Sequence, residues 1–182
     1  SFLVLKRGDL FWRNTTLLWI KSMAESNTEL VMDIKAIIKH QCNRYPVLLI
    51  DKIVDLVPGE CATGIKCFTY NEWYFLGHFE DDPNVPGFVQ TETLAQTFIM
   101  TFLCKPEYAG MKTNSVSINN IQFKRKIVPG DVLRIEAELK SFKRGLAVGS
   151  ASSSVDGEPA CSAEFVVAVP DILDQFKPKS FG

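Results

Sequence analysis

The chain has 182 residues, of which 46% are hydrophobic and 23% charged, the profile of one globular domain large enough to bury a core. Twenty basic side chains against 21 acidic ones give a formal net charge of −1, which excludes a global attraction to nucleic acid or to an anionic membrane. Five widely spaced cysteines without a C-x-x-C pair favour a reducing compartment and argue against a zinc site. No segment has the length and apolar character of a membrane-spanning helix.

Residues 1–31 differ from the rest of the chain. The first 21 carry four basic side chains, one acidic side chain and two tryptophans. We expect a flexible extension, or a segment upstream of the translated start, followed by a single domain over residues 32–182. A basic, acid-poor segment could also serve as an organelle transit peptide, in place of the cytoplasmic location otherwise expected.

Three elements are predicted before the centre of the chain. Isoleucines at helical spacing predict a short helix after Asp33, which Pro46 interrupts. Val47–Leu56 is predicted to be a strand that ends at a Pro-Gly pair. Alternating residue types predict a second strand over Cys61–Cys67, and an irregular segment then leads to His78.

The centre of the chain is a helix that is apolar on nearly every face. Phe88–Leu103 has helical length and follows a Pro-Gly turn, so other structure must wrap around it. Strands are predicted over Leu133–Lys140, Leu146–Val155 and Ala160–Val169, the last two joined by a turn at Asp156-Gly157. Together these elements predict an α+β fold in which an antiparallel sheet curls around a long central helix.

Two residues have the chemistry of proton transfer. His78 is one of two histidines, and Glu92 is the only charged residue between Pro83 and Cys104. A glutamate on a buried helix would have its pKa raised, which suits a general acid, and Gln96 on the same face could orient it. The alternative is a carboxylate that only stabilises a helix N-terminus.

The surroundings of His78 and Gly87 leave two interpretations open. A lone histidine is more often structural than catalytic, but His78 lies between an irregular segment and a proline-rich turn. Gly87 could donate its backbone N–H to a substrate carbonyl, or it could serve only the turn. A base, an acid and an oxyanion donor are the set needed to remove a proton beside a thioester carbonyl and expel a β-hydroxyl as water. That chemistry requires no metal and no other cofactor.

Short motifs occur in a fixed order between about Asp33 and Val169. They are Arg44-Tyr45-Pro46-Val47-Leu48-Leu49-Ile50-Asp51, Asn71-Glu72, Gly77-His78-Phe79, Pro83, Pro86-Gly87, Glu92-Thr93-Leu94-Ala95-Gln96, Phe123-Lys124-Arg125 and Val128-Pro129-Gly130-Asp131. In this order and spacing they resemble the FabZ-type 3-hydroxyacyl-acyl carrier protein dehydratases, which have the hotdog fold. Each motif alone is weak, and the combination is specific.

The resemblance implies a function and a set of roles. The activity would be dehydration of (3R)-hydroxyacyl-acyl carrier protein to trans-2-enoyl-acyl carrier protein in fatty acid biosynthesis. His78 and Glu92 would be the catalytic pair, contributed by the two subunits of a homodimer, and three dimers would form a hexamer. Gly87 would bind the thioester carbonyl, with Gln96 beside the glutamate. A glutamate at position 92 resembles the dehydratases rather than the dehydratase-isomerases, and leaves an isomerase side activity open.

The chain departs from the family at three places. Asn43 stands where the family usually has histidine, Asp81-Asp82 replaces Gly-Arg near the site entrance, and Lys126 replaces a common proline.

Charge complementarity predicts where a carrier would dock. An acidic carrier protein could bind the basic cluster Lys124, Arg125 and Lys126, and Lys143 and Arg144 could lie beside it, although charged residues at strand ends are often only a solvated face.

Two alternative functions share the fold. One is an acyl thioesterase that activates water with the helix carboxylate, and the other is an acyl- or carrier-binding protein without turnover. The sequence does not determine the acyl chain length or the pathway.

Overall fold

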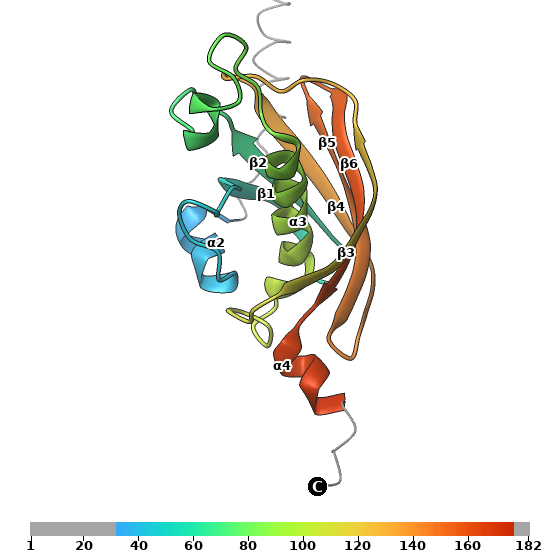
Figure 1. Cartoon of the computed structure of the whole chain (residues 1–182). Coiled ribbons are helices and arrows are strands. Elements are labelled where there is room, and N and C mark those ends of the chain that lie inside the picture. Colours follow the sequence, from blue (N-terminus) through green and yellow to red (C-terminus); the bar gives the residue numbers. More distant parts are fainter. Residues whose placement is uncertain (1–31, 177–182) are drawn as a thin grey trace, which may run out of the picture.

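The computed structural model describes residues 32–176, so the predictions for residues 1–31 lie outside the described part of the chain (Figure 1). The elements in chain order are α2 (Ile34–His40), β1 (Lys52–Val57), β2 (Cys61–Cys67), the 3-10 helix η1 (Trp73–Leu76), α3 (Gly87–Leu103), β3 (Asn114–Phe123), β4 (Val132–Lys143), β5 (Leu146–Val155), β6 (Glu158–Ala168), α4 (Pro170–Leu173) and the 3-10 helix η2 (Asp174–Phe176).

One antiparallel sheet of six strands wraps helix α3. The strand order is β1-β2-β4-β5-β6-β3, so β1 and β3 are the two edges (Figure 1). β4, β5 and β6 follow one another along the chain, and the turn between β5 and β6 contains Asp156 and Gly157 with φ of 51° and 83°. The predicted arrangement, an antiparallel sheet around a long central helix, is confirmed.

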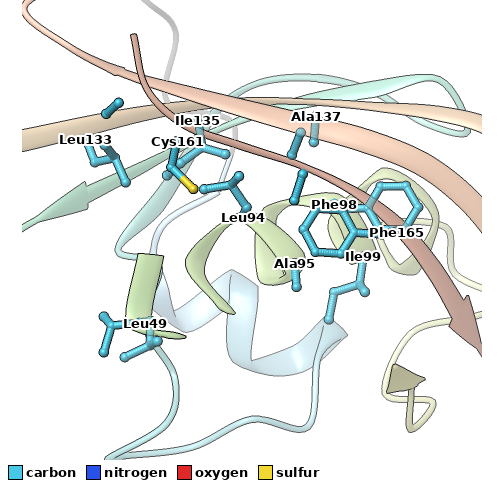
Figure 2. Packing of buried hydrophobic residues seen from close by; sticks show 14 of the residues in the cluster. Leu49, Leu94, Ala95, Phe98, Ile99, Leu133, Ile135, Ala137, Cys161 and Phe165 are labelled. Atoms are coloured by element: carbon cyan, nitrogen blue, oxygen red, sulfur yellow. The ribbon is translucent and has the colours of Figure 1, made fainter. Parts of the chain in front are cut away.

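The core lies between α3 and the concave face of the sheet. Leu133, Ile135 and Ala137 of β4 are buried, as their strict alternation with charged residues predicts. Figure 2 shows Leu94 and Phe98 of α3 on the side that faces these strands. Phe98 stacks on Phe165 of β6 with 5.7 Å between ring centroids, and burying such a ring contributes roughly 1.5–3 kcal/mol.

The polar residues inside α3 are satisfied within the helix. Thr93 donates its hydroxyl hydrogen to the Val89 carbonyl at 2.7 Å, and Thr97 donates to the Thr93 carbonyl at 3.2 Å. Both side chains are fully buried. Because their hydroxyls bond to the preceding turn, the threonines do not interrupt the apolar contact with the sheet. No helix in the described part of the chain is both long and apolar enough to cross a membrane.

One predicted strand began at the wrong residue, and one strand was not predicted. β1 begins at Lys52 rather than Val47, because the Val47 carbonyl and the Leu49 N–H bond to a side chain of α3 instead of to a strand. β3 was not predicted at all. Its apolar and polar residues alternate only in two short runs, which Asn119-Asn120 separates. All of its residues are at least partly exposed, and its pairing is irregular around Asn120 with φ of 52°. It is an edge strand in which neither run is long enough to give the alternation of a half-buried strand.

Gly149 of β5 allows α3 to approach the sheet. A methyl group there would overlap both the Glu138 carbonyl oxygen and the Phe98 ring. We expect Gly149→Ala to lower the free energy of unfolding by about 2–3 kcal/mol, measured by urea denaturation. Gly77→Ala is the control, since its methyl group would meet no atom within 4 Å and its φ is −122°. Equal losses in the two variants would contradict this account of the packing.

Candidate active site

One flank of α3 is left open by the sheet. Gly87, Phe88 and Glu92 are the residues of this helix that are not buried, and all three line the same cavity. Its volume is about 660 Å³. The other lining residues come from the segment after α2, from η1, from α3 and from β3, and all are uncharged: Asn43, Pro46, Val47, Leu49, Trp73, Val89, Thr91, Ile118, Ile121 and Phe123. Glu92 is therefore the one ionisable side chain that the described residues place on this cavity.

The Glu92 carboxyl is held by amide groups. Gln96 donates an Nε2–H to Glu92 Oε1 at 2.8 Å, and Asn43 Nδ2 lies 3.4 Å from the same oxygen. Burial raises the pKa of Glu92 above its ordinary value, and the two amide hydrogen bonds oppose this shift only in part. The predicted raised pKa and the predicted contact with Gln96 are both confirmed. The catalytic roles of the two residues stay predictions.

Gln96 also fixes the segment that replaces the start of the predicted strand. Its Oε1 accepts the Leu49 N–H at 2.8 Å, and its Nε2 donates to the Val47 carbonyl at 2.6 Å as well as to Glu92. Because a backbone N–H can only donate, this contact determines which end of the amide is oxygen. The Gln96 amide therefore has every hydrogen and its oxygen engaged, and it is almost fully buried.

Gly87 begins α3 beside this carboxyl. The first amides of a helix have no acceptor within the helix, so the Gly87 N–H is a candidate donor to a substrate oxygen. A Cβ at position 87 would lie 2.9 Å from the tip of the Phe123 ring, so glycine leaves room for this ring beside the start of α3. The glycine thus has a packing role in addition to the role as an oxyanion donor that the sequence suggests.

His78 lies in the loop between η1 and α3. Its Nδ1 lies 2.9 Å from the Asn84 carbonyl oxygen, and the Asn84 N–H donates to the His78 carbonyl at 2.9 Å. Because a carbonyl can only accept, Nδ1 must carry a hydrogen, which leaves Nε2 of the neutral ring as a base. The ring is half-buried. Within the described chain, His78 is not among the residues that line the cavity beside Glu92.

A buried ion pair holds the segment that leads to His78. Lys66 of β2 is 6% exposed, donates to Glu72 just before η1, and lies 3.7 Å from the Asp51 carboxylate. A buried charge needs such partners, because leaving one uncompensated costs several kcal/mol. The contact therefore ties η1, and with it the loop of His78, to the sheet.

Two of the three basic residues predicted to dock a carrier protein already face carboxylates of this chain. Lys126 forms an ion pair with Asp82, and the Arg125 guanidinium lies 3.7 Å from Asp131. Two of the departures from the family pattern, Asp82 and Lys126, therefore compensate each other's charge. Lys124 has no ion pair within residues 32–176.

Lys143 and Arg144 do not belong to this cluster, and the prediction that they could lie beside it was wrong. Phe123, next to the cluster, pairs with Cys161 at the start of β6, whereas Leu146 pairs with Ala168 at its end. Seven strand residues span about 23 Å.

Asn43 is the site residue that the sequence did not single out. It was noted only as a departure from a motif, and its contact with Glu92 joins residues 49 positions apart. The one signal was its place directly before Arg44-Tyr45-Pro46. Within residues 32–176, no three His, Cys, Asp or Glu side chains gather in a way that could hold a metal ion.

The fold and the cavity define a class: hotdog-fold proteins with a carboxyl group on the central helix. The FabA-like domain model matches residues 42–164. The 3-hydroxyacyl-[acyl-carrier-protein] dehydratase FabZ of Clostridium novyi is 42% identical over 139 residues, which cover 76% of this chain and 96% of the relative. The FabZ of Chloroflexus aggregans is 43% identical over 141 residues, 78% of this chain and 96% of the relative. The chain belongs to the FabA-like family and, within it, to the FabZ-type dehydratases.

Solved structures confirm the hotdog fold. The dehydratase heterocomplex ApeI:P from Xenorhabdus doucetiae superposes with a TM-score of 0.65 at 14% identity, covering 79% of this chain and 97% of that one. The protein PH1136 from Pyrococcus horikoshii gives a TM-score of 0.54 at 11% identity, covering 69% and 86%. At these identities the likeness shows the fold alone.

The burial of Glu92 predicts a pH-dependent change in stability. Because the pKa is raised above 4.5, the folded chain binds this proton more tightly than the unfolded chain. The tighter binding of this proton in the folded chain stabilises the fold fully below about pH 4.5. This stabilisation is lost as the pH rises through the pKa of Glu92 in the folded chain. Glu92→Gln removes this titration, so we expect it to be more stable than the wild type at pH 8, with the difference closing towards pH 4.

Urea denaturation at several pH values measures this difference. Glu107→Gln makes the same chemical change at an exposed residue beyond the end of α3 and should show no such pH-dependent gap. A Glu92→Gln variant no more stable than the wild type at pH 8 would refute the proposed cost of burying the carboxylate.

Proposed function

We propose that this enzyme is a hydro-lyase that dehydrates (3R)-hydroxyacyl-acyl carrier protein to trans-2-enoyl-acyl carrier protein in fatty acid biosynthesis. The observation that carries the proposal is the Glu92 carboxyl, held by amides on an otherwise uncharged cavity beside the first backbone amide of α3. The identity to FabZ dehydratases over most of the chain supports the same reaction.

In the proposed reaction, three groups act as the base, the oxyanion donor and the acid. Nε2 of neutral His78 removes the proton from C2, and the electron pair of that C–H bond forms the C2–C3 double bond. The Gly87 N–H stabilises the negative charge that develops on the thioester oxygen. Glu92 gives its proton to the departing C3 hydroxyl, which leaves as water. The proton on His78 then returns to the Glu92 carboxylate, and the site is ready for the next turnover without a cofactor.

We place the complete site between two copies of the chain. In one chain His78 does not line the Glu92 cavity, which supports a site in which the two residues come from different copies. The edge strand β3 exposes large apolar side chains next to that cavity, with Val116 59% and Phe123 52% exposed. A homodimer that covers this edge would bring the His78 loop of one copy to the cavity of the other. Assembly of three such dimers into a hexamer is part of the proposal and rests on the family resemblance.

The carrier would dock at the mouth of the site through a small number of charges. Lys124 is the member of the basic cluster best placed for this, because Arg125 and Lys126 already face carboxylates of their own chain. The five free cysteines support a reducing compartment such as the cytoplasm. An organelle location would depend on residues 1–31, which lie outside the described chain.

The reaction is tested with a 3-hydroxyacyl thioester on acyl carrier protein, following the conjugated enoyl product by its ultraviolet absorbance. We expect turnover by the wild type, and a fall in kcat of roughly 10²–10⁴-fold with little change in KM for both His78→Ala and Glu92→Gln. Glu107→Gln is the matched control and should retain full activity.

Three results would contradict the proposal. Near-native turnover by both variants would remove the mechanism. Release of a free thiol from a simple acyl thioester, without enoyl product, would show a thioesterase instead. Tight binding of an acyl carrier without water loss would show a non-catalytic binding protein.

The shared site makes a separate prediction. His78→Ala and Glu92→Gln chains, each inactive alone, are unfolded together and refolded as a mixture. Half of the randomly formed dimers contain one of each chain, and one of the two sites in such a dimer is unaltered. We therefore expect about a quarter of the wild-type activity to return. No recovery in a mixture shown by mass spectrometry to contain mixed dimers would mean that one chain supplies both residues.

A further inference from the structure

The two amide contacts to Glu92 reach the same oxygen. Gln96 Nε2 lies 2.8 Å from Oε1 and Asn43 Nδ2 lies 3.4 Å from Oε1, whereas Oε2 has no hydrogen bond within residues 32–176. An amide N–H has no lone pair with which to accept a hydrogen. When Glu92 is protonated, Oε1 therefore has to remain the acceptor, and the hydrogen is directed to Oε2.

Asn43 is held in place from its own side. The Arg44 guanidinium donates to the carbonyls of Asn43 and Gln41, both at 2.7 Å, and to the Ile38 carbonyl at 2.8 Å. These contacts fasten the backbone at Asn43 to the C-terminal end of α2. On the other side, Gln96 holds the Val47 carbonyl and the Leu49 N–H. Asn43 thus lies in a short segment fixed at both ends, with its side chain directed at the carboxyl group.

We infer that Asn43 is a positioning residue for Glu92: with Gln96 it keeps Oε1 as an acceptor and leaves Oε2 as the oxygen that delivers the proton. This role deepens the proposed dehydration and rests on it for its catalytic meaning. At 3.4 Å the contact is long for a neutral carboxyl group, and it strengthens as Glu92 becomes negative. Asn43 therefore stabilises the state after proton transfer more than the state before it.

Few other charges act on Glu92. It is the single charged residue of α3 and of the cavity lining. Arg44, the cation in the segment next to Asn43, donates its hydrogen bonds to backbone carbonyls instead. In the proposed dimer the His78 ring of the other copy would also face it. Within one chain, burial and the two amides remain the causes of its pKa, and burial is the larger.

The hydrogen bond can be tested without turnover. The pKa of Glu92 is measured by NMR in protein made with carboxyl-¹³C glutamate, with Glu92→Gln to identify the signal. We expect Asn43→Leu, which keeps the size of the side chain but cannot donate, to raise the pKa by about half a unit to one unit. Asn43→His returns an N–H at the same distance along the side chain and should bring the pKa back to the wild-type value or below. Asn43→Ala carries the same expectation as Asn43→Leu and guards against a leucine variant that does not fold.

The catalytic consequence is measured in parallel. Asn43→Leu should lower kcat about three- to tenfold with KM unchanged and move the alkaline limb of the pH profile upwards, and Asn43→His should reverse both effects. An unchanged Glu92 pKa in Asn43→Leu and Asn43→Ala, or a shift that Asn43→His does not reverse, would overturn the inference. A wild type without dehydratase activity would refute the proposed function, while the titration would still decide whether Asn43 holds the carboxyl group.

Discussion

A helix that is apolar on nearly every face is stable in water only when other structure surrounds it, and this constraint on α3 determines both the fold and the place of the site. Fourteen of its 17 residues are buried. A sheet can cover such a helix only by curling, and a single curled sheet with two free edges leaves one flank open. Gly87, Phe88 and Glu92 occupy that flank. The cavity is therefore a direct consequence of how the helix is wrapped.

The same constraint sets the chemistry of the carboxyl group. A glutamate on a helix of this kind cannot be fully solvated, so its proton is held more tightly than in water. The amides of Gln96 and Asn43 limit this effect without adding a charge. An arginine or lysine in their place would hold the carboxylate form and make a poor proton donor. Neutral donors would keep the group available for the proposed role as an acid, and burying it costs stability of the folded chain, as is common at active sites.

Local patterns explain what could be predicted from the sequence, and long-range contacts explain what could not. The helix at α3, the alternation in β4 and the Glu92–Gln96 contact all depend on residues a few positions apart. The start of β1 depended on the Gln96 side chain, which is 47 to 49 positions away along the chain. The contact between Asn43 and Glu92 likewise joins residues 49 positions apart. β3 was missed because Asn119-Asn120 breaks its apolar alternation into two short runs. Sequence proximity could not reveal that Lys143 lies at the far end of the sheet from Lys124, because strand register decides it.

An uncharged cavity also simplifies the return of the proton in the proposed mechanism. His78 takes a proton while Glu92 loses one, so the cavity passes from two neutral groups to an ion pair and back. The Nδ1 contact with the Asn84 carbonyl keeps the removable proton on Nε2, and the amides on Oε1 leave Oε2 to receive it. Because the described residues put no ionisable group other than Glu92 on the cavity, a proton on the His78 ring of the other copy would have one carboxyl group there to accept it. In the proposed mechanism, the backbone and amide contacts would thus set the direction of proton transfer by fixing one nitrogen and one oxygen.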